Sequence, residues 1–316
     1  MSSTFADLGV PADLVAVLSR RSIDQPFPIQ TLTLPDALSG RDVSGRAPTG
    51  SGKTLAFGIA AIARLDRRPS RAGRPRVLVL VPTRELCAQV ASELAPLASE
   101  RALAVTPVYG GVSYGRQTRP LSQGAEVVVA CPGRLTDLVG AGHVRLDGVE
   151  VVVVDEADRM ADMGFLPTVG RLLDRTPSTR QTLLFSATLD GDVDSLVRRY
   201  QRDPIRHEVG AHEALAPVVE HLFWRTETAG RVALVASVVA MSGSTIVFCR
   251  TRRGADRVAR QLVASDLRAA VIHGDRSQAQ RERALGGFAA GRVDALVATD
   301  VAARGIHVQG VAVVIH

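Results

Sequence analysis

Lysine is nearly absent from this sequence of 316 residues. Lysine and arginine together number 38, and Lys53 is the only lysine among them. The stretch around it, GRAPTGSGKTLAF at residues 45–57, keeps lysine in a chain that otherwise uses arginine. Because arginine carries the same charge, this exception predicts a role at residue 53 that a planar guanidinium cannot fill.

Cysteine and long apolar runs are also scarce. The three cysteines, Cys87, Cys131 and Cys249, are widely separated and lack metal-ligand or disulfide spacing, which favours a reducing, cytoplasmic location. No apolar run reaches the roughly 18 residues of a membrane helix, and the N-terminus lacks a basic stretch followed by a long apolar one. We therefore expect a soluble protein that is not exported and has no membrane partner.

The composition suits a globular protein with a core of small aliphatic residues. Hydrophobic residues make up 46% of the chain and aromatic residues only 4%. The net charge of +6 and the isoelectric point near 10.0 fit a polyanionic partner. A genome that favours arginine and alanine codons explains the charge equally well, so composition leaves both interpretations open.

Short apolar runs rich in valine and leucine recur along the chain. They occupy residues 76–82, 126–130, 149–156, 182–188, 244–249, 294–300 and 311–315. Because these runs do not alternate with polar residues, they are typical of parallel strands buried on both faces. Stretches with helical spacing lie between them, at residues 84–99, 252–265 and 278–291. Strands alternating with helices predict a doubly wound α/β fold.

The length predicts about two domains on the usual prior of about 150 residues each. Residues 198–220 lack a long apolar run and contain Pro204, Gly210 and Pro217. We therefore interpret this stretch as the last strand of the first domain followed by a linker, and predict a first domain over residues 1–209, a linker over 210–217 and a second domain over 218–316. The arginine-rich stretch 64–76 is interpreted as a solvated surface loop, with a nucleic-acid contact as the less favoured alternative.

Residues 47–54, APTGSGKT, lie between a strand-like segment and an amphipathic helical one. Gly50 and Gly52 would let backbone N–H groups curl around phosphate oxygens, and the helix N-terminus would add its dipole. Lys53 would reach the β and γ phosphates, and the Thr54 hydroxyl would bind Mg²⁺. A chance glycine turn is the alternative, because Ala47 replaces the first glycine of the usual pattern.

Two adjacent carboxylates, Asp155 and Glu156, end the apolar run VVVVDEAD at residues 151–158. At the carboxyl end of a strand in an open α/β sheet, such groups point into the ligand crevice. Asp155 could hold Mg²⁺ through water, and Glu156 could orient and deprotonate an attacking water. Acidic residues also begin helices, but a phosphate loop about a hundred residues upstream favours the catalytic interpretation.

With DEAD at residues 155–158, the sequence resembles the DEAD-box family of ATP-dependent RNA helicases over nearly its whole length. SIDQPFPIQ (22–30) is similar to the adenine-contacting motif, and SAT (186–188) to the segment that couples nucleotide state to domain closure. Blocks similar to those of the family also occur as PTREL (82–86), GG (110–111), PGR (132–134), IVFCRT (246–251), HGDRSQAQRER (273–283) and ATDVAARGI (298–306). The resemblance implies two tandem RecA-like doubly wound parallel-sheet domains, the second incomplete.

The same resemblance implies ATP and Mg²⁺ as cofactors and RNA as a partner, bound through its backbone with little base selectivity, by a monomer. It implies nucleotide contacts from Phe5, Gln30, Thr49, Gly50, Ser51, Gly52, Lys53, Thr54 and Gly305, and Mg²⁺ ligands Thr54 and Asp155. The implied catalytic residues are Lys53, Asp155, Glu156, Asp158, Ser186 and Thr188. The implied RNA contacts are Pro82, Thr83, Arg84, Gly111, Pro132, Gly133, Arg134, Arg250, Thr251, Gly274, Gln278, Arg281, Thr299, Asp300 and Arg304.

The sequence departs from the family at a few positions. Ser22 stands where the adenine motif usually begins with glycine, and Ile23 where it usually has an aromatic residue. The family's arginine-finger block, HRxGRxGR, does not occur in residues 1–316. Because such arginines can be worth about 10³ to 10⁵ in rate, two hypotheses stay open. One is an ATP-dependent RNA helicase, and the other is an ATP- and RNA-binding fragment with little or no turnover.

Overall fold

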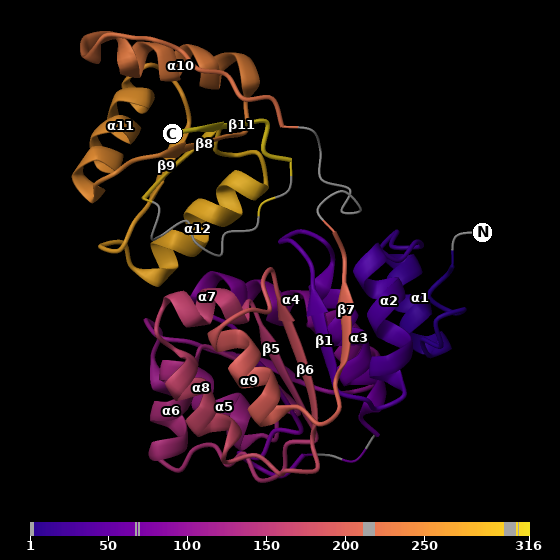
Figure 1. The fold of residues 1–316 in the computed structure, drawn as a ribbon. Helices are drawn as coiled ribbons and strands as arrows, with labels where there is room; N and C mark the ends of the chain where they lie inside the picture. Colours follow the sequence, from indigo (N-terminus) through magenta and orange to yellow (C-terminus); the bar gives the residue numbers. More distant parts are fainter. Residues whose placement is uncertain (1–2, 67, 69, 211–218, 300–307, 309) are drawn as a thin grey trace. The chain divides into compact units, whose positions relative to one another are not determined.

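The computed structural model describes residues 3–66, 68, 70–210, 219–299, 308 and 310–316. The chain divides into two compact units, Met1–Pro217 (unit 1) and Val218–His316 (unit 2). Both units are built from parallel strands alternating with helices, so the predicted doubly wound α/β fold is confirmed (Figure 1). Among the described helices, none combines the length and the apolar character needed to span a bilayer.

Unit 1 contains a seven-stranded parallel sheet in the order β3-β4-β2-β5-β6-β1-β7. Its strands are β1 (Val43–Arg46), β2 (Val77–Leu80), β3 (Val105–Val108), β4 (Val127–Ala130), β5 (Val151–Asp155), β6 (Gln181–Ser186) and β7 (Ile205–Glu208). Its helices are α1 (Ala12–Arg20), α2 (Pro28–Leu38), α3 (Lys53–Arg64), α4 (Arg84–Glu100), α5 (Tyr114–Ser122), α6 (Pro132–Gly140), α7 (Ala157–Asp162), α8 (Leu166–Leu173) and α9 (Asp192–Tyr200).

Two hydrophobic clusters cover the two faces of this sheet. Val151 and Val153 of β5 join side chains of α1 to α4, whereas Val152 and Val154 join side chains of α5 to α9. Every residue of β2, β4, β5 and β6 is buried. Burial on both faces explains why the central strands read as continuous apolar runs rather than as alternating ones.

Unit 2 contains a four-stranded parallel sheet in the order β11-β8-β10-β9. Its elements are a 3₁₀ turn (Thr228–Gly230), α10 (Arg231–Ser242), β8 (Thr245–Phe248), α11 (Arg252–Ala264), β9 (Ala269–Ile272), α12 (Gln278–Ala289), β10 (Ala295–Ala298) and β11 (Val313–Ile315). Helices α10 and α11 pack on one face of this sheet, and α12 packs on the other. Every apolar run identified in the sequence thus overlaps a strand in one of the two units.

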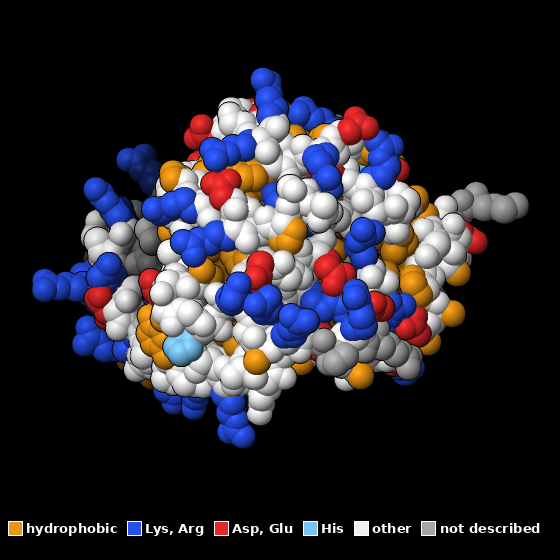
Figure 2. Space-filling model, turned by 90° about the horizontal axis from the view of Figure 1, so that it is seen from below, with side chains coloured by type: hydrophobic (Ala, Val, Ile, Leu, Met, Phe, Trp, Pro, Cys, Tyr) orange, Lys and Arg blue, Asp and Glu red, His pale blue; other side chains and the backbone are white. Residues whose placement is uncertain are grey.

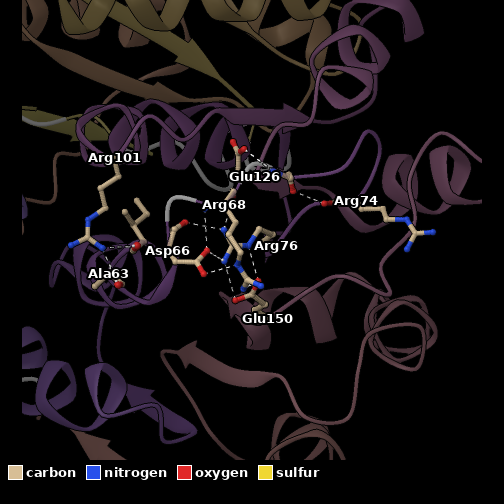
Figure 3. Close-up of polar contacts among 10 residues, drawn as sticks. Ala63, Asp66, Arg68, Arg74, Arg76, Arg101, Glu126 and Glu150 are labelled. Carbon is tan, nitrogen blue, oxygen red and sulfur yellow. Dashed lines mark hydrogen bonds and ion pairs between the residues drawn. The ribbon is translucent and has the colours of Figure 1, made fainter.

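The arginine-rich stretch 64–76 is largely the exposed loop that its composition predicts, but Arg76 is an exception. Arg76 is only 6% exposed. Its guanidinium pairs with Asp66 at 2.7 Å and with Glu150 at 2.6 Å, and it donates to the backbone oxygens of Asp66 and Arg68 at 2.9 Å each (Figure 3). A buried cation is retained only when it is paired and hydrogen-bonded, so Arg76 anchors this stretch to the start of β5.

Several surface arginines of unit 1 are paired with acidic side chains. Figure 2 shows basic side chains beside acidic ones across the face that it presents. Asp147, for example, pairs with Arg74 at 3.2 Å and with Arg145 at 2.9 Å. Exposed pairs of this kind contribute about 0–1 kcal/mol each, so their main effect is to neutralise arginines that composition alone would count as free positive charge.

Candidate active site and nucleic-acid interface

Three neighbouring strands bring the predicted catalytic segments to one edge of unit 1. In the order β5-β6-β1, Arg46 of β1 is paired in register with Ser186 of β6, and Asp155 of β5 is paired with Phe185. The phosphate loop follows β1 directly, so it begins level with Ser186 and Asp155. The carboxyl edge of an open parallel sheet is where α/β proteins bind ligands.

Two glycines in left-handed conformations shape the loop at 47–52. Gly50 has φ +85° and Gly52, the residue that precedes α3, has φ +86°. A Cβ atom on Gly52 would lie 2.4 Å from a ring carbon of Phe27 and 2.5 Å from Nε2 of Gln30. Residue 52 therefore needs glycine both for its conformation and for the close approach of these side chains.

Lys53 lies at the base of this loop and is 7% exposed. Its Nζ donates to the backbone oxygens of Ala47 at 2.8 Å and of Pro48 at 2.9 Å. An ammonium can make both bonds from one small donor, whereas a planar guanidinium would need a wider space. The structure thus gives a physical reason why residue 53 is lysine. The contact of Lys53 with a phosphate stays a prediction.

Gln30 connects the segment 22–30 to the phosphate loop. The side chain is 1% exposed, its Nε2 donates to the Gly52 oxygen at 2.9 Å, and its Oε1 accepts from the Phe27 N–H at 2.8 Å. Its contact with an adenine edge stays a prediction. Phe5 is packed in the core at 2% exposed, so the structure shows it as a packing residue, and its nucleotide contact is likewise untested.

The carboxylates sit in a tight turn at the end of β5. Glu156 has φ +51°, a left-handed value that is uncommon outside glycine, and its N–H donates to Oδ1 of Asp155 at 2.9 Å. The Asp158 N–H donates to Oγ of Ser186 at 3.1 Å. This last bond directly connects the DEAD segment with the SAT segment, whereas Thr188 is exposed.

Asp155 is a buried carboxyl whose pKa departs from its usual value. Burial raises the pKa of Asp155 to about 7, the nearby Lys53 ammonium opposes that rise, and the charge of Glu156 adds to it. Raised pKa values caused by burial and specific charges are typical of functional sites, although ion-pair networks also produce them.

We expect Asp155 to lower the stability of unit 1 as the pH rises. The folded protein holds this proton up to about pH 7, whereas an unfolded chain releases it near 3.8, so unfolding releases a proton between these values. The free energy of unfolding should therefore fall by at most about 4 kcal/mol between pH 4 and pH 7. Above pH 7 this contribution should stay constant. Asp155→Asn should remove this loss.

Urea denaturation in EDTA at pH 5 and pH 8 measures this effect. The variant should exceed the wild type in unfolding free energy at pH 8, and the difference should shrink at pH 5. Asp162→Asn, which changes an exposed carboxylate on α7, is the matched control. An equal gain at both pH values, or an equal gain in the control, would contradict the burial argument.

In unit 1 the predicted RNA-contacting blocks follow β2, β3 and β4, which are neighbours in the sheet. Thr83 caps α4 by accepting from the Leu86 N–H at 3.3 Å, and Arg84 is exposed. Arg134 donates to the Val112 oxygen at 3.0 Å and lies 4.4 Å from the centre of the Tyr114 ring. The glycines Gly111 and Gly133 are exposed, whereas Pro82 and Pro132 are buried. Exposed backbone and arginine groups thus gather at one edge.

In unit 2 the corresponding blocks follow β8, β9 and β10. Thr251 caps α11 by accepting from the Gly254 N–H at 3.0 Å. Arg250 and Gly274 are exposed, whereas Gln278 and Thr299 are buried. Gln278 begins α12, and Arg281 follows one turn later in the same helix. Asp300, Arg304 and Gly305 lie outside the described residues.

His273 is a structural histidine in this arrangement. It is 2% exposed, its Nε2 lies 3.1 Å from Oδ1 of Asp256, and its Nδ1 accepts from the Asp275 N–H at 3.3 Å. The hydrogen bond from His273 is the largest cause that holds the pKa of Asp256 below its usual range; burial opposes it, and the hydrogen bond from Arg276 adds to the lowering. The histidine therefore fixes the turn that presents Gly274.

Comparison with known families agrees with this geometry. The family model described as DEAD/DEAH box helicase matches residues 27–196, and the one described as Helicase conserved C-terminal domain matches residues 230–316. The chain belongs to the DEAD-box family of RNA helicases. The predicted resemblance is confirmed.

Several DEAD-box relatives cover nearly the whole chain. A chloroplastic DEAD-box ATP-dependent RNA helicase 3A of Zea mays is 46% identical over 98% of this chain and 43% of its own length. The helicase CshA of Bacillus subtilis is 37% identical over 98% of this chain and 63% of its own length. The chain thus spans about half to two thirds of these relatives.

Solved DEAD-box structures show the same fold. A DEAD box protein from Methanococcus jannaschii aligns with a TM-score of 0.63 at 30% identity, covering 98% of this chain and 83% of that one. Dbp5 of Saccharomyces cerevisiae aligns with a TM-score of 0.84 at 24% identity, covering 99% and 80%. Together with the two parallel sheets, these matches confirm the RecA-like fold.

The structure also shows features of the candidate site that the sequence analysis did not predict. Arg159 pairs with Oε2 of Glu156 at 2.6 Å, and its position three residues after Glu156 on α7 was the only signal for this contact. Phe27, 44% exposed, lies against the phosphate loop beside Gly52. Ser22 has φ +57°, a turn conformation that explains why the family usually places glycine there.

The residues at this site fit Mg²⁺ as it is bound with nucleotides. Among the described residues, no group of three or more His, Cys, Asp and Glu side chains is placed to hold a metal. Mg²⁺ keeps several waters and is usually bound through one or two protein ligands plus substrate phosphates, so such a cage is not required. The buried Asp155 carboxyl and the Thr54 hydroxyl supply oxygen ligands of the kind that Mg²⁺ prefers.

Proposed function

We propose that this chain carries the core of an ATP-dependent RNA helicase that hydrolyses ATP and clamps single-stranded RNA through its backbone. The observation that carries the proposal is the meeting of the Lys53 loop, Asp155–Glu156 and Ser186 at the carboxyl edge of the unit 1 sheet. Relatives of this chain are named ATP-dependent RNA helicases, which supports both the nucleotide and the nucleic acid.

In this proposal each residue of the site has one task. The N–H groups of the loop and of the start of α3 bind phosphate oxygens, and Lys53 turns from its two carbonyl partners toward the β and γ phosphates. Thr54 and Asp155 would hold Mg²⁺, which supplies charge neutralisation on the phosphates when bound. Glu156, which directly follows Asp155 at the carboxyl end of β5, takes a proton from the attacking water.

Asp158, Ser186 and Thr188 would transmit the nucleotide state. The bond from the Asp158 N–H to Ser186 ties the turn after β5 to the end of β6. A change at Glu156 during hydrolysis therefore reaches the SAT segment through one hydrogen bond. We propose that residues 1–209 and 218–316 act as two domains joined by residues 210–217. Binding of ATP would then favour a closed state in which the two domains hold the RNA strand.

RNA binding in this proposal uses phosphate and sugar contacts rather than base contacts. In unit 1 the exposed Arg84, Gly111 and Gly133 supply guanidinium and backbone N–H donors. In unit 2 Arg250, Thr251 and Gly274 supply similar donors, and Gln278, Arg281, Thr299, Asp300 and Arg304 complete the proposed set. Donors of this kind grip the backbone without reading sequence. We therefore propose low base selectivity.

RNA-dependent release of phosphate from ATP tests the proposal. We expect poly(U) and poly(A) to stimulate release by similar factors, because the clamp does not distinguish bases. Stimulation by only one polymer would contradict the backbone clamp. Binding of ATP and RNA without release would favour the fragment with little turnover instead.

The setting and assembly of the protein are further proposals. Cys87, Cys131 and Cys249 form no disulfide bond in the structure, which suits a reducing compartment such as the cytoplasm. Each of the two units has its own hydrophobic clusters, which suits a monomer. Sedimentation velocity of the purified chain tests this assignment.

A further inference from the structure

Unit 2 has a groove that the proposed helicase function does not use. The groove has a volume of about 770 Å³ and runs along β9 between α11 and α12. Figure 1 shows β9 at the margin of the sheet with these two helices on either side of it. None of the residues assigned to nucleotide or RNA lines it.

The floor of the groove is the outer edge of a strand. Within the described residues, β9 has β10 as its one neighbour in the sheet. The oxygens of Arg268 and Ile272 accept from residues on the β10 side. Because backbone groups alternate in direction along a parallel strand, the N–H and C=O groups of Ala269 and Val271 point outward into the groove.

Small side chains keep this edge accessible. Ala269 and Val271 face the cluster of α11, whereas Ala270 faces the cluster of α12. The walls add Val263 of α11, which is 54% exposed, and Ala284 of α12. An added strand would therefore place its side chains alternately against an apolar wall of α11 and an apolar wall of α12.

The rim of the groove is positively charged. Arg260 of α11 and Arg283 of α12 are exposed on opposite walls, and Arg276 also lines the groove. Asp256 is the one acidic residue that lines the groove, and it is already bonded to Arg276 and His273. The two exposed guanidiniums thus favour an occupant that carries carboxylates.

We propose that this groove binds an extended acidic segment of a partner protein, which adds as a strand to the outer edge of β9. Main-chain bonds to Ala269 and Val271 supply the affinity, and carboxylates that reach Arg260 and Arg283 supply the selectivity. Edge strands are templates for such pairing unless they are covered, and here both walls leave room for it. The proposal does not depend on ATP hydrolysis.

Fluorescence anisotropy with a defined peptide tests the proposal on the full chain. The probe is the fluorescein-labelled octapeptide EVDVEVDG, compared with KVKVKVKG and with an EVDVEVDG that is N-methylated at alternate residues. We expect saturable binding of the acidic probe alone, since reversed charge removes the rim contacts and N-methyl groups block strand pairing. Absence of saturable binding at about 1 mM, or equal binding of the three peptides, overturns it.

Charge-reversed variants locate the site on the surface. Arg260→Glu combined with Arg283→Glu should weaken binding of EVDVEVDG about tenfold or more, because both rim charges become repulsive. Arg257→Glu, an exposed residue of α11 outside the groove, is the matched control and should change it little. RNA-stimulated phosphate release should be unchanged in both. An equal loss of peptide binding in the control overturns the assignment.

Hydrogen exchange distinguishes a strand from other occupants. On addition of EVDVEVDG, the amides of Ala269 and Val271 should become protected, because their outward N–H groups gain acceptors. Binding without this protection indicates a helical occupant and overturns strand addition. Displacement of the peptide by a decauridine RNA indicates a nucleic-acid surface and overturns the protein partner.

Discussion

Replacing Lys53 with alanine is expected to lower RNA-stimulated phosphate release by about 100-fold or more, because one preorganised donor to a developing charge is worth that much. The sharper variant is Lys53→Arg, which keeps the charge. The ammonium occupies a site that is 7% exposed and bonds two carbonyls, of Ala47 and Pro48, within 2.9 Å. A guanidinium fills more space with fixed donor directions, so the loss should be nearly as large.

Controls separate this effect from misfolding. Arg64→Ala removes an exposed basic residue at the other end of α3 and should leave phosphate release unchanged. Urea denaturation of Lys53→Arg checks that unit 1 still folds. If a folded Lys53→Arg variant released phosphate at the wild-type rate, residue 53 would contribute only its charge. The sole lysine would then need another explanation.

The fold could be predicted because both faces of the central strands are buried. The run VVVVD of β5 is fully buried, and its neighbours β2 and β6 are equally buried, so continuous hydrophobicity was a direct signal of a parallel sheet. Their order could not be predicted, because parallel strands are paired through crossovers that sequence patterns do not specify. The order β5-β6-β1 is what brings the site together.

Two strands were missed for physical reasons. Strand β3 contains Pro107 and lies at the edge of its sheet, where a missing N–H is tolerated but where the sequence pattern is weak. Strand β9, also at an edge, consists half of alanine, which carries little strand preference. Because β9 was not predicted, the groove along it could not be predicted either: nothing in the sequence marked residues 269–272 as an exposed strand.

At the site, residue types could be predicted but their partners could not. The adjacent Asp155 and Glu156 were evident from the sequence, whereas the pairing of Glu156 with Arg159 depends on the left-handed turn at residue 156. Similarly, an arginine-rich stretch predicts solvent exposure, whereas Arg76 is buried where it pairs with Asp66 of the same stretch and with Glu150, which directly precedes β5. Long-range partners of this kind reverse a prediction based on composition.

Glu156→Gln is expected to lower phosphate release by about 10² to 10⁴, the range for loss of general base catalysis, while ATP and RNA still bind. Glutamine keeps the size of the side chain and can still accept a hydrogen bond from Arg159, but it cannot take a proton from water. Because hydrolysis releases the clamp in this mechanism, the lifetime of the RNA complex with ATP should lengthen. Phosphate release and dissociation of labelled RNA measure both effects.

Arg159→Gln determines whether the ion pair or the proton transfer accounts for the loss. This variant removes the partner of Glu156 and leaves the carboxylate in place, so it should retain more phosphate release than Glu156→Gln. Equal losses in the two variants would indicate that orientation by Arg159 is as important as the base itself. Persistent RNA-stimulated release by Glu156→Gln would rule out Glu156 as the base, because no proton acceptor would remain on that side chain.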